Sequence, residues 1–333
     1  MVGRSGPDGR AVRSRRQQRT DPRRAVTRWS AALTRAGITD PHLRHAYDAQ
    51  RTLVRRNRRE EYLATRLLLP APIHPAVIAA VAFMDETDRR IDSGDIPTRQ
   101  DTLRSWDRQV TAALAGEPTE NETLRVLADT ARRHPVLGAR VRGFLDGAPV
   151  EATWSGFATE ADFQDYVDRY SLPALMLTAS LIGPAPDAEQ HEPFRRGCRR
   201  LIEAMQRTDF LADLAEDVGQ GRVGIPKDEL DRHGLDFDSL RERPQECAPA
   251  VGRLVDAQAE RAGTVLARCR SLPELVAPEY RPFLSALISV QELRLEAVRR
   301  NRGSLLQRGA SPAPSAALRV LWRGYRAARG GRF

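Results

Sequence analysis

Apolar residues recur along this 333-residue chain at the three- and four-residue spacing of amphipathic helices. The spacing is clearest in seven segments: 60–69, 76–92, 121–133, 161–182, 195–218, 249–271 and 280–301. Breaks rich in proline and glycine separate most of them. The alternating polar and apolar pattern of β-strands is absent. The pattern therefore predicts an all-α fold, with capping boxes at Thr119–Glu122 and, more weakly, at Thr159–Asp162.

Both ends of the chain differ from this helical body. Residues 1–28 mix arginine with serine, glycine, proline and glutamine and have few apolar residues, which predicts a disordered tail. Residues 29–306 are expected to form one helical domain. Residues 307–316, QRGASPAPSA, are typical of a linker. The remaining segment, 307–333, is therefore expected to consist of this linker and a C-terminal helix.

The C-terminal helix carries both apolar and basic side chains. An apolar stripe at helical spacing lies opposite three arginines: Leu318, Leu321, Trp322 and Tyr325 against Arg319, Arg323 and Arg326. Such a helix either docks on its own domain or lies loosely on an anionic membrane as a peripheral contact. The pattern leaves both alternatives open.

The net charge of +9 is concentrated at the two ends. Residues 1–28 contain nine arginines and two aspartates, and residues 317–333 contain five arginines and no acid, so the body is slightly negative. A nucleic-acid-binding protein carries its positive charge on the folded surface, so no nucleic-acid partner is expected. There is no apolar run of about 20 residues and no secretory signal pattern. The three cysteines are far apart in sequence, which favours a cytoplasmic protein.

Two helical segments carry regularly spaced carboxylates. In the first, Asp88 and Asp92 project from one helix face, one turn apart. A plain surface face is the alternative here, because Asp85 is placed to pair with Arg89, and Glu86 with Arg90.

The second segment favours a site more strongly. Asp209, Asp213 and Asp217 form an acidic ladder on successive turns, and Arg207 is the only nearby base. Like charges at this spacing destabilise a helix by about 0.2–0.5 kcal/mol per pair, so the ladder calls for a compensating cation. Magnesium binds through a few carboxylates and shares its other positions with phosphate oxygens. If the two segments face each other, they would hold Mg²⁺ ions around a diphosphate and neutralise its charge as it leaves.

Several motifs resemble the squalene/phytoene synthase family over roughly residues 45–305. They are the segment from Tyr62 to Pro70, Ala82-Phe83 followed by Asp88-Arg-Arg-Ile-Asp92, Tyr166-Val-Asp-Arg169, Gln206 through Asp217, Gly221 through Pro226, and Asp228-Glu-Leu230. The resemblance implies an isoprenoid-synthase-type helical domain with a central cavity. It also implies a prenyltransferase that binds prenyl diphosphates through Mg²⁺ at the two aspartate motifs.

The resemblance also implies roles for individual residues. Asp88, Asp92, Asp213 and Asp217 would hold the metal, and Asp209 would add a ligand or act as a base. Arg222 would grip the diphosphate. Further substrate-binding positions are expected at Gln206, Tyr62, Arg66, Tyr166, Tyr170 and Asp85, with ordinary core packing as the alternative for the tyrosines.

Departures from the family pattern point to a particular chemistry. Asp85 and Glu86 stand where the family has bases, Ala212 where it has arginine, and Gly224 where it has tyrosine. Fewer bases favour one diphosphate and one uncharged aromatic acceptor, such as a carbazole. The near-absence of lysine, with Lys227 alone, indicates a GC-rich genome, as in actinomycetes. The chain also resembles squalene-synthase-like enzymes of actinomycete secondary metabolism, which transfer a prenyl group to such an aromatic acceptor. The alternatives are head-to-head condensation of two prenyl diphosphates and a non-catalytic pathway partner.

Overall fold

A computed structural model describes residues 22–330. Within that range all regular secondary structure is helical and no strand occurs, which confirms the predicted all-α class. The elements of the N-terminal half are α1 (Pro22–Arg35), α2 (Pro41–Asn57), α3 (Arg59–Leu68), the 3₁₀ turn η1 (Ala71–Ile73), α4 (His74–Ile91), α5 (Ile96–Leu114), α6 (Glu122–Arg133) and α7 (Pro135–Ala152).

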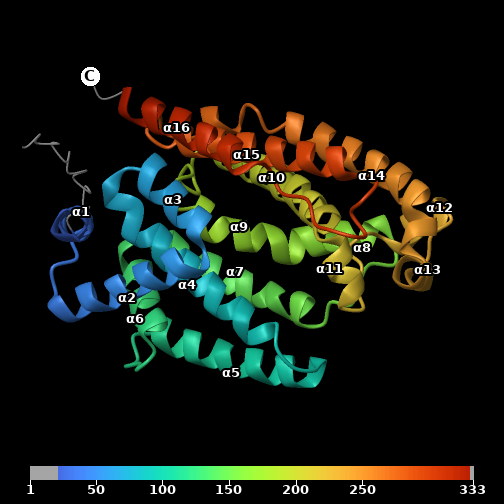
Figure 1. Cartoon of the computed structure of the whole chain (residues 1–333). Coiled ribbons are helices and arrows are strands. Elements are labelled where there is room, and N and C mark those ends of the chain that lie inside the picture. The colour runs from blue at the N-terminus through green and yellow to red at the C-terminus, as the bar shows by residue number, and fades with distance from the viewer. Residues whose placement is uncertain (1–21, 331–333) are drawn as a thin grey trace, which may run out of the picture.

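The C-terminal half contains the longest helices. Its elements are α8 (Glu160–Tyr166), the π-helical turn η2 (Val167–Ser171), α9 (Leu172–Ala179), α10 (His191–Ala212), α11 (Leu214–Gly219), α12 (Lys227–Arg232), α13 (Phe237–Glu242), α14 (Pro244–Ala267), the 3₁₀ turn η3 (Leu272–Leu275), α15 (Arg281–Asn301) and α16 (Pro314–Gly330). Helices α10, α14, α15 and α16 lie along one side of the molecule, and α5 lies on the other (Figure 1).

Helix α1 begins at Pro22, inside the segment 1–28 that the sequence analysis expected to be a tail. Proline suits the first turn of a helix, where its missing N–H leaves no bond unmade. The helix is also held by packing, since Trp29, Ala32 and Leu33 are buried in the main core. Sequence composition could not show that α1 packs against the main core. The rest of the predicted tail, residues 1–21, lies outside the described residues.

Local signals explain where several helices start. Aspartate or asparagine side chains cap α2, α5 and α6 through Asp40, Asp95 and Asn121. The capping box predicted at Thr159–Asp162 is confirmed at the start of α8. The one predicted at Thr119–Glu122 is wrong, because Asn121 is the residue whose side chain accepts the capping bond. At each of these helix starts, the side chain of the N-cap residue accepts a hydrogen bond from a backbone N–H of the first turn.

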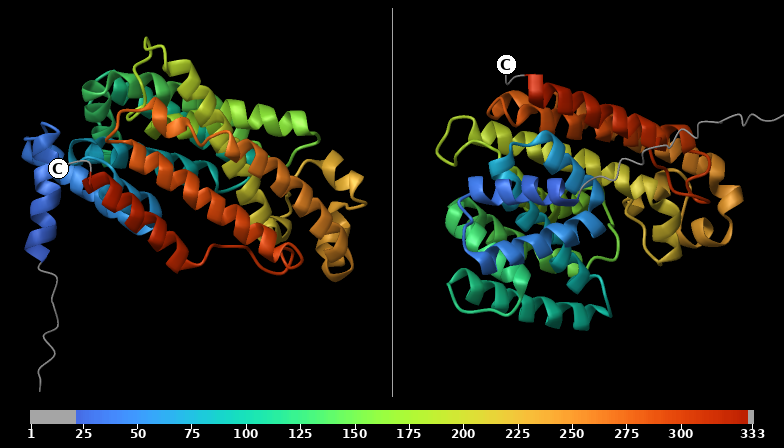
Figure 2. Two further views of the ribbon diagram at one scale, coloured as in Figure 1. Left: turned by 90° about the horizontal axis from the view of Figure 1, so that it is seen from above. Right: turned by 60° about the vertical axis from the view of Figure 1, so that its left-hand side comes forward.

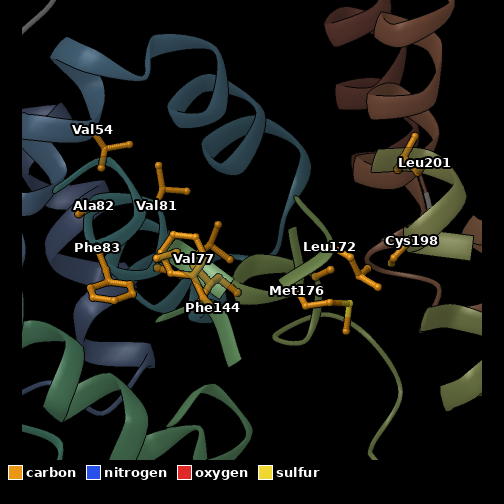
Figure 3. Close-up of a cluster of buried hydrophobic side chains, with 14 of the residues drawn as sticks. Val54, Val77, Val81, Ala82, Phe83, Phe144, Leu172, Met176, Cys198 and Leu201 are labelled. Atoms are coloured by element: carbon orange, nitrogen blue, oxygen red, sulfur yellow. The ribbon is translucent and has the colours of Figure 1, made fainter. Parts of the chain in front are cut away.

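The main core surrounds α4, which is buried on every side over its first half, from His74 to Phe83. Figure 3 shows the side chains there, with Val77, Val81 and Phe83 near Phe144 of α7, and Met176 of α9 toward α10. The second half of α4 carries the first aspartate motif. The core therefore fixes the direction in which those carboxylates point.

Among residues 22–330, no helix has both the length and the apolar character that spanning a bilayer requires.

Candidate active site

The first aspartate motif lies at the C-terminal end of α4, where the helix leaves the apolar core. Asp92 is the residue that ends the helix, and its N–H donates to the carbonyl of Asp88 at 2.9 Å. Burial raises the pKa of Asp88 to about 6, while Arg58 opposes the shift. Desolvation by the neighbouring protein also raises the pKa of Asp92, although its side chain remains accessible to solvent. A carboxylate pair whose charged form is disfavoured in this way would be stabilised by a cation.

The second motif does not lie on one continuous helix, as the sequence analysis expected. Helix α10 ends at Ala212, Asp213 caps it, and Asp217 belongs to the short helix α11. The i to i+4 backbone bonds nevertheless continue, at 2.9 Å from Asp213 to Asp209 and from Asp217 to Asp213. Burial raises the pKa of both Asp209 and Asp217 to about 6, and Asp213 adds to each shift through its like charge.

The π-helical turn η2 connects the two motifs. Tyr170 donates its phenol proton to Asp88 at 3.1 Å, and the next residue, Ser171, donates to the side-chain carbonyl of Gln206 at 3.3 Å. Two adjacent residues therefore contact motifs that lie more than 100 residues apart in sequence. π-Turns inside helices occur frequently at functional sites. Tyr170 therefore lies against the first motif, and its neighbour Ser171 lies against the second.

Arg222 lies between the two motifs. Its guanidinium is 3.7 Å from the Asp217 carboxylate, and its charge lowers the pKa of Asp92 as well as that of Asp217 against the larger effect of burial. It lies 5.1 Å from the centre of the Trp154 ring. Its buried Nε donates to no acceptor among the described residues. A cation with an unused donor at this position is suited to an anionic ligand.

Two further arginines at the motifs were missed in the sequence. Arg58, at the junction of α2 and α3, pairs with Asp85 at 2.7 Å and Asp88 at 3.1 Å. Arg294 of α15 pairs with Asp209 at 3.2 Å. Both come from helices distant in sequence, and nothing marks them within their arginine-rich segments. The site is therefore richer in bases than a position-by-position comparison with the family pattern suggested.

Glu151 of α7 is a third acidic contribution that the sequence analysis missed. It accepts a 2.5 Å hydrogen bond from the Tyr166 phenol. Burial raises the pKa of Glu151, and Asp92 adds to the shift while Arg222 opposes it. The sequence feature that could have identified Glu151 is that it is the only charged residue in the stretch 147–154. Tyr166 thus contacts the site through Glu151.

Three predicted substrate-binding residues have other partners. Asp85 is buried and accepts bonds from Asn57 and Arg58, which hold its pKa below the usual range although burial opposes this. It also pairs with Arg89, as expected from the i,i+4 spacing. Arg66 lies against His74. Tyr62 is half-buried and packs against the main core. None of the three has a described contact with Asp92 or with the second motif.

The carboxylates fit a hard divalent cation in their chemistry. Asp92 and Asp213, one in each motif, are solvent-exposed and form no ion pair with another described residue. Yet within residues 22–330 no three potential ligand side chains are close enough to hold an ion by themselves. Magnesium bound here would therefore take its remaining ligands from water and substrate phosphate, as is usual for this ion.

The side of the site next to Arg222 is an aromatic cluster formed by Trp154, Phe157, Phe163, Tyr166 and Phe210. Phe210 stacks on Trp154 with ring centres 5.4 Å apart. A Cβ added at Gly224 would lie 2.1 Å from the Phe210 ring. The glycine that replaces the family's tyrosine thus makes room for Phe210.

We expect Gly224→Ala to lower the melting temperature, because overpacking costs about 1–3 kcal/mol. Adding Phe210→Leu should restore part of the loss by removing the ring that clashes. Gly252→Ala on α14 is the matched control, since an added Cβ meets nothing there. Thermal unfolding of the four proteins tests this. A Gly224→Ala protein as stable as the control, or a double variant no better than the single one, would contradict it.

Comparisons with known proteins identify relatives of this chain. Residues 54–319 match the family model described as squalene/phytoene synthase. The chain is 29% identical over 275 residues to the bifunctional protein CrtB/UppS of Streptomyces coelicolor, a match that covers 82% of this chain and 47% of that protein. It is 30% identical over 193 residues to a phytoene synthase of Mycobacterium tuberculosis, covering 58% of this chain and 61% of the relative. The chain thus spans only about half to three fifths of these relatives.

Solved structures show the same fold. Squalene synthase HpnC from Alicyclobacillus acidocaldarius superposes with a TM-score of 0.70 at 22% identity, covering 80% of this chain and 98% of that one. A dehydrosqualene synthase solved with a ligand superposes with a TM-score of 0.72 at 20% identity, covering 87% and 98%.

Proposed function

The chain belongs to the squalene/phytoene synthase family, and on that premise we propose that it condenses two prenyl diphosphates head to head with the help of Mg²⁺. The observation that carries the proposal is the placement of Arg58, Arg222 and Arg294, each ion-paired with an aspartate of one of the two motifs. Two diphosphates bring a large negative charge into one site, and these cations offset it together with metal ions.

The proposed role of each residue follows from its position in one of the two motifs. Asp88 and Asp92 would hold metal on one side, and Asp213 and Asp217 on the other, with Asp209 as a further ligand beside Arg294. The metal neutralises negative charge on the departing diphosphate. Arg222 and Gln206 would contact that diphosphate. Apolar side chains around the bound prenyl chain would shield a carbocation from water.

A second candidate is transfer of one prenyl group to an aromatic acceptor. Two observations favour it. Asp85 and Glu86 neutralise Arg58, Arg89 and Arg90, and the aromatic cluster next to Arg222 would stack on a flat ring. On this reading Asp209 or Glu151 would accept the ring proton.

The product formed without an acceptor distinguishes the two. Purified protein is incubated with farnesyl or geranylgeranyl diphosphate and Mg²⁺, with a chelator control. We expect a metal-dependent hydrocarbon or cyclopropyl diphosphate product of doubled chain length. Turnover only after addition of an indole or carbazole would support the second candidate. No metal-dependent consumption of either diphosphate under any condition would favour the non-catalytic alternative.

A further inference from the structure

Helix α16 lies on the outside of the molecule, alongside α15 in both views of Figure 2. It docks through its small residues. A Cβ added at Gly324 would lie 2.9 Å from the Leu68 side chain of α3 and 3.5 Å from Ala286 of α15. The helix therefore rests on α3 and α15 by its glycine side. Of the two alternatives for this helix, docking on its own domain occurs, and it partly buries Leu321 and Tyr325 of the apolar stripe beside Gly324.

The other half of the apolar stripe, Leu318 and Trp322, is exposed to solvent. Leu318 is 62% exposed and Trp322 61% exposed, and the Trp322 ring stacks on Tyr325. Four large hydrophobic side chains are exposed in the part of the chain that the structure describes: Leu67, Ile96, Leu318 and Trp322. Leu67 lies on α3, which α16 contacts. Three of the four thus occur on two touching helices. Concentration of exposed apolar side chains in one region marks an interaction surface.

The same helix presents unbalanced positive charge. Arg319, Arg323, Arg326 and Arg329 are exposed, α16 contains no acid, and none of the four forms an ion pair with a described residue. Elsewhere on the surface, arginines such as Arg89 and Arg302 pair with nearby carboxylates. On the helical wheel Arg319, Arg323 and Arg326 lie on the side of Trp322 that faces away from Leu321 and Tyr325. A partner must therefore offer an apolar region to Leu318 and Trp322 and an adjacent anionic region to the arginines.

We propose that α16, together with Leu67 of α3, is a docking surface for an anionic phospholipid membrane. A bilayer surface offers this combination, because tryptophan and leucine enter the interface while arginines face the headgroups. Nucleic acid would leave Leu318 and Trp322 without a partner. A second copy of the chain would bring two arginine rows together with no acid between them. This surface, defined by Leu67, Leu318, Trp322 and the four arginines, is here named the α16 surface.

The proposal goes beyond the proposed function and does not depend on it. It does place the α16 surface near the candidate site. Helix α15 carries Arg294, which pairs with Asp209, and α3 carries Glu60, which pairs with the same arginine at 3.1 Å. The α16 surface therefore packs on the same two helices that carry Arg294 and Glu60.

The test is flotation of the full-length protein with lipid vesicles, without substrate. One set contains equal parts phosphatidylglycerol and phosphatidylcholine, and the other contains phosphatidylcholine alone. We expect binding to the anionic set at about 0.1 M salt and its loss at about 1 M salt. Arg319→Gln with Arg323→Gln should weaken binding roughly thirtyfold, about fivefold for each arginine. Trp322→Ser should weaken it at least about tenfold.

The control is Arg104→Gln with Arg108→Gln, which removes the same charge from α5 on the opposite side of the molecule (Figure 1). It should bind like the unaltered protein. Equal binding to neutral vesicles, no binding to anionic ones, or equal loss in the control would overturn the proposal. So would a concentration-dependent dimer that the Trp322→Ser change dissociates, or tighter binding to duplex DNA than to vesicles. Far-ultraviolet circular dichroism verifies that each variant is folded.

Discussion

Asp213→Ala and Asp217→Ala should each lower turnover at least about a hundredfold, equivalent to about 2.7 kcal/mol of transition-state stabilisation. Each change removes an oxygen ligand from the metal that accepts the charge of the leaving diphosphate. Asp213→Ala is the easier substitution to interpret, because Asp213 is exposed and has no ion pair with another described residue. Steady-state release of diphosphate measures the effect.

The same variants should melt no lower than the unaltered protein without metal. Burial raises the pKa of Asp217 to about 6. An acid whose pKa is higher in the folded state loses stability as the pH rises through that range, so its charged form destabilises the fold at neutral pH. Removing Asp217 should therefore help more at pH 8 than at pH 5. Magnesium with a prenyl diphosphate should raise the melting temperature of the unaltered protein by linkage, and much less in either variant.

Asp231→Ala is the matched control, because this exposed carboxylate pairs with Lys227 away from the site. It should leave both turnover and the metal-dependent thermal shift unchanged. Variants at 213 and 217 that keep their activity but melt several degrees lower would assign the ladder a structural role instead.

Arg222→Gln should reduce kcat/KM about ten- to a hundredfold, the range expected for losing a hydrogen bond to a charged group. The guanidinium lies between Asp217 and Asp92, and its buried Nε has no acceptor among the described residues. Losing this charge should also raise the pKa of Asp217 further. The acid limb of the pH–rate profile should consequently move to higher pH, which a purely structural role would not produce.

Arg241→Gln is a close control for this change. Arg241 pairs with Asp238 at 3.3 Å and lies 5.5 Å from the Phe237 ring, so it has a carboxylate and an aromatic neighbour as Arg222 does. Its substitution should leave kcat/KM and the pH profile unchanged. An equal fall in both variants, or a fall at Arg222 with an unmoved pH profile, would contradict the assigned role.

The sequence alone determined the local features of this protein. Apolar spacing gave the all-α class and the main helices, because periodicity reports the geometry of a helix and its buried side. The spacing of Asp88 and Asp92 put both on one side of α4 for the same reason. The motifs from Gln206 to Pro226 identified the family, since they combine several residue types at fixed separations. The Thr159–Asp162 capping box was likewise readable, because its partners are three residues apart.

The tertiary structure decided which distant side chains meet. Arg58 and Arg294 pair with the motif aspartates, and Glu151 lies beside Asp92. No spacing in the chain predicts these contacts, so the count of bases from sequence was too low. The docking side of α16 was undetermined in the same way. A helix shows its apolar stripe in sequence, but only its neighbours decide which part of that stripe is covered. Here Leu321 and Tyr325 are partly buried and Leu318 and Trp322 are exposed, because burial depends on the shape of the opposing surface.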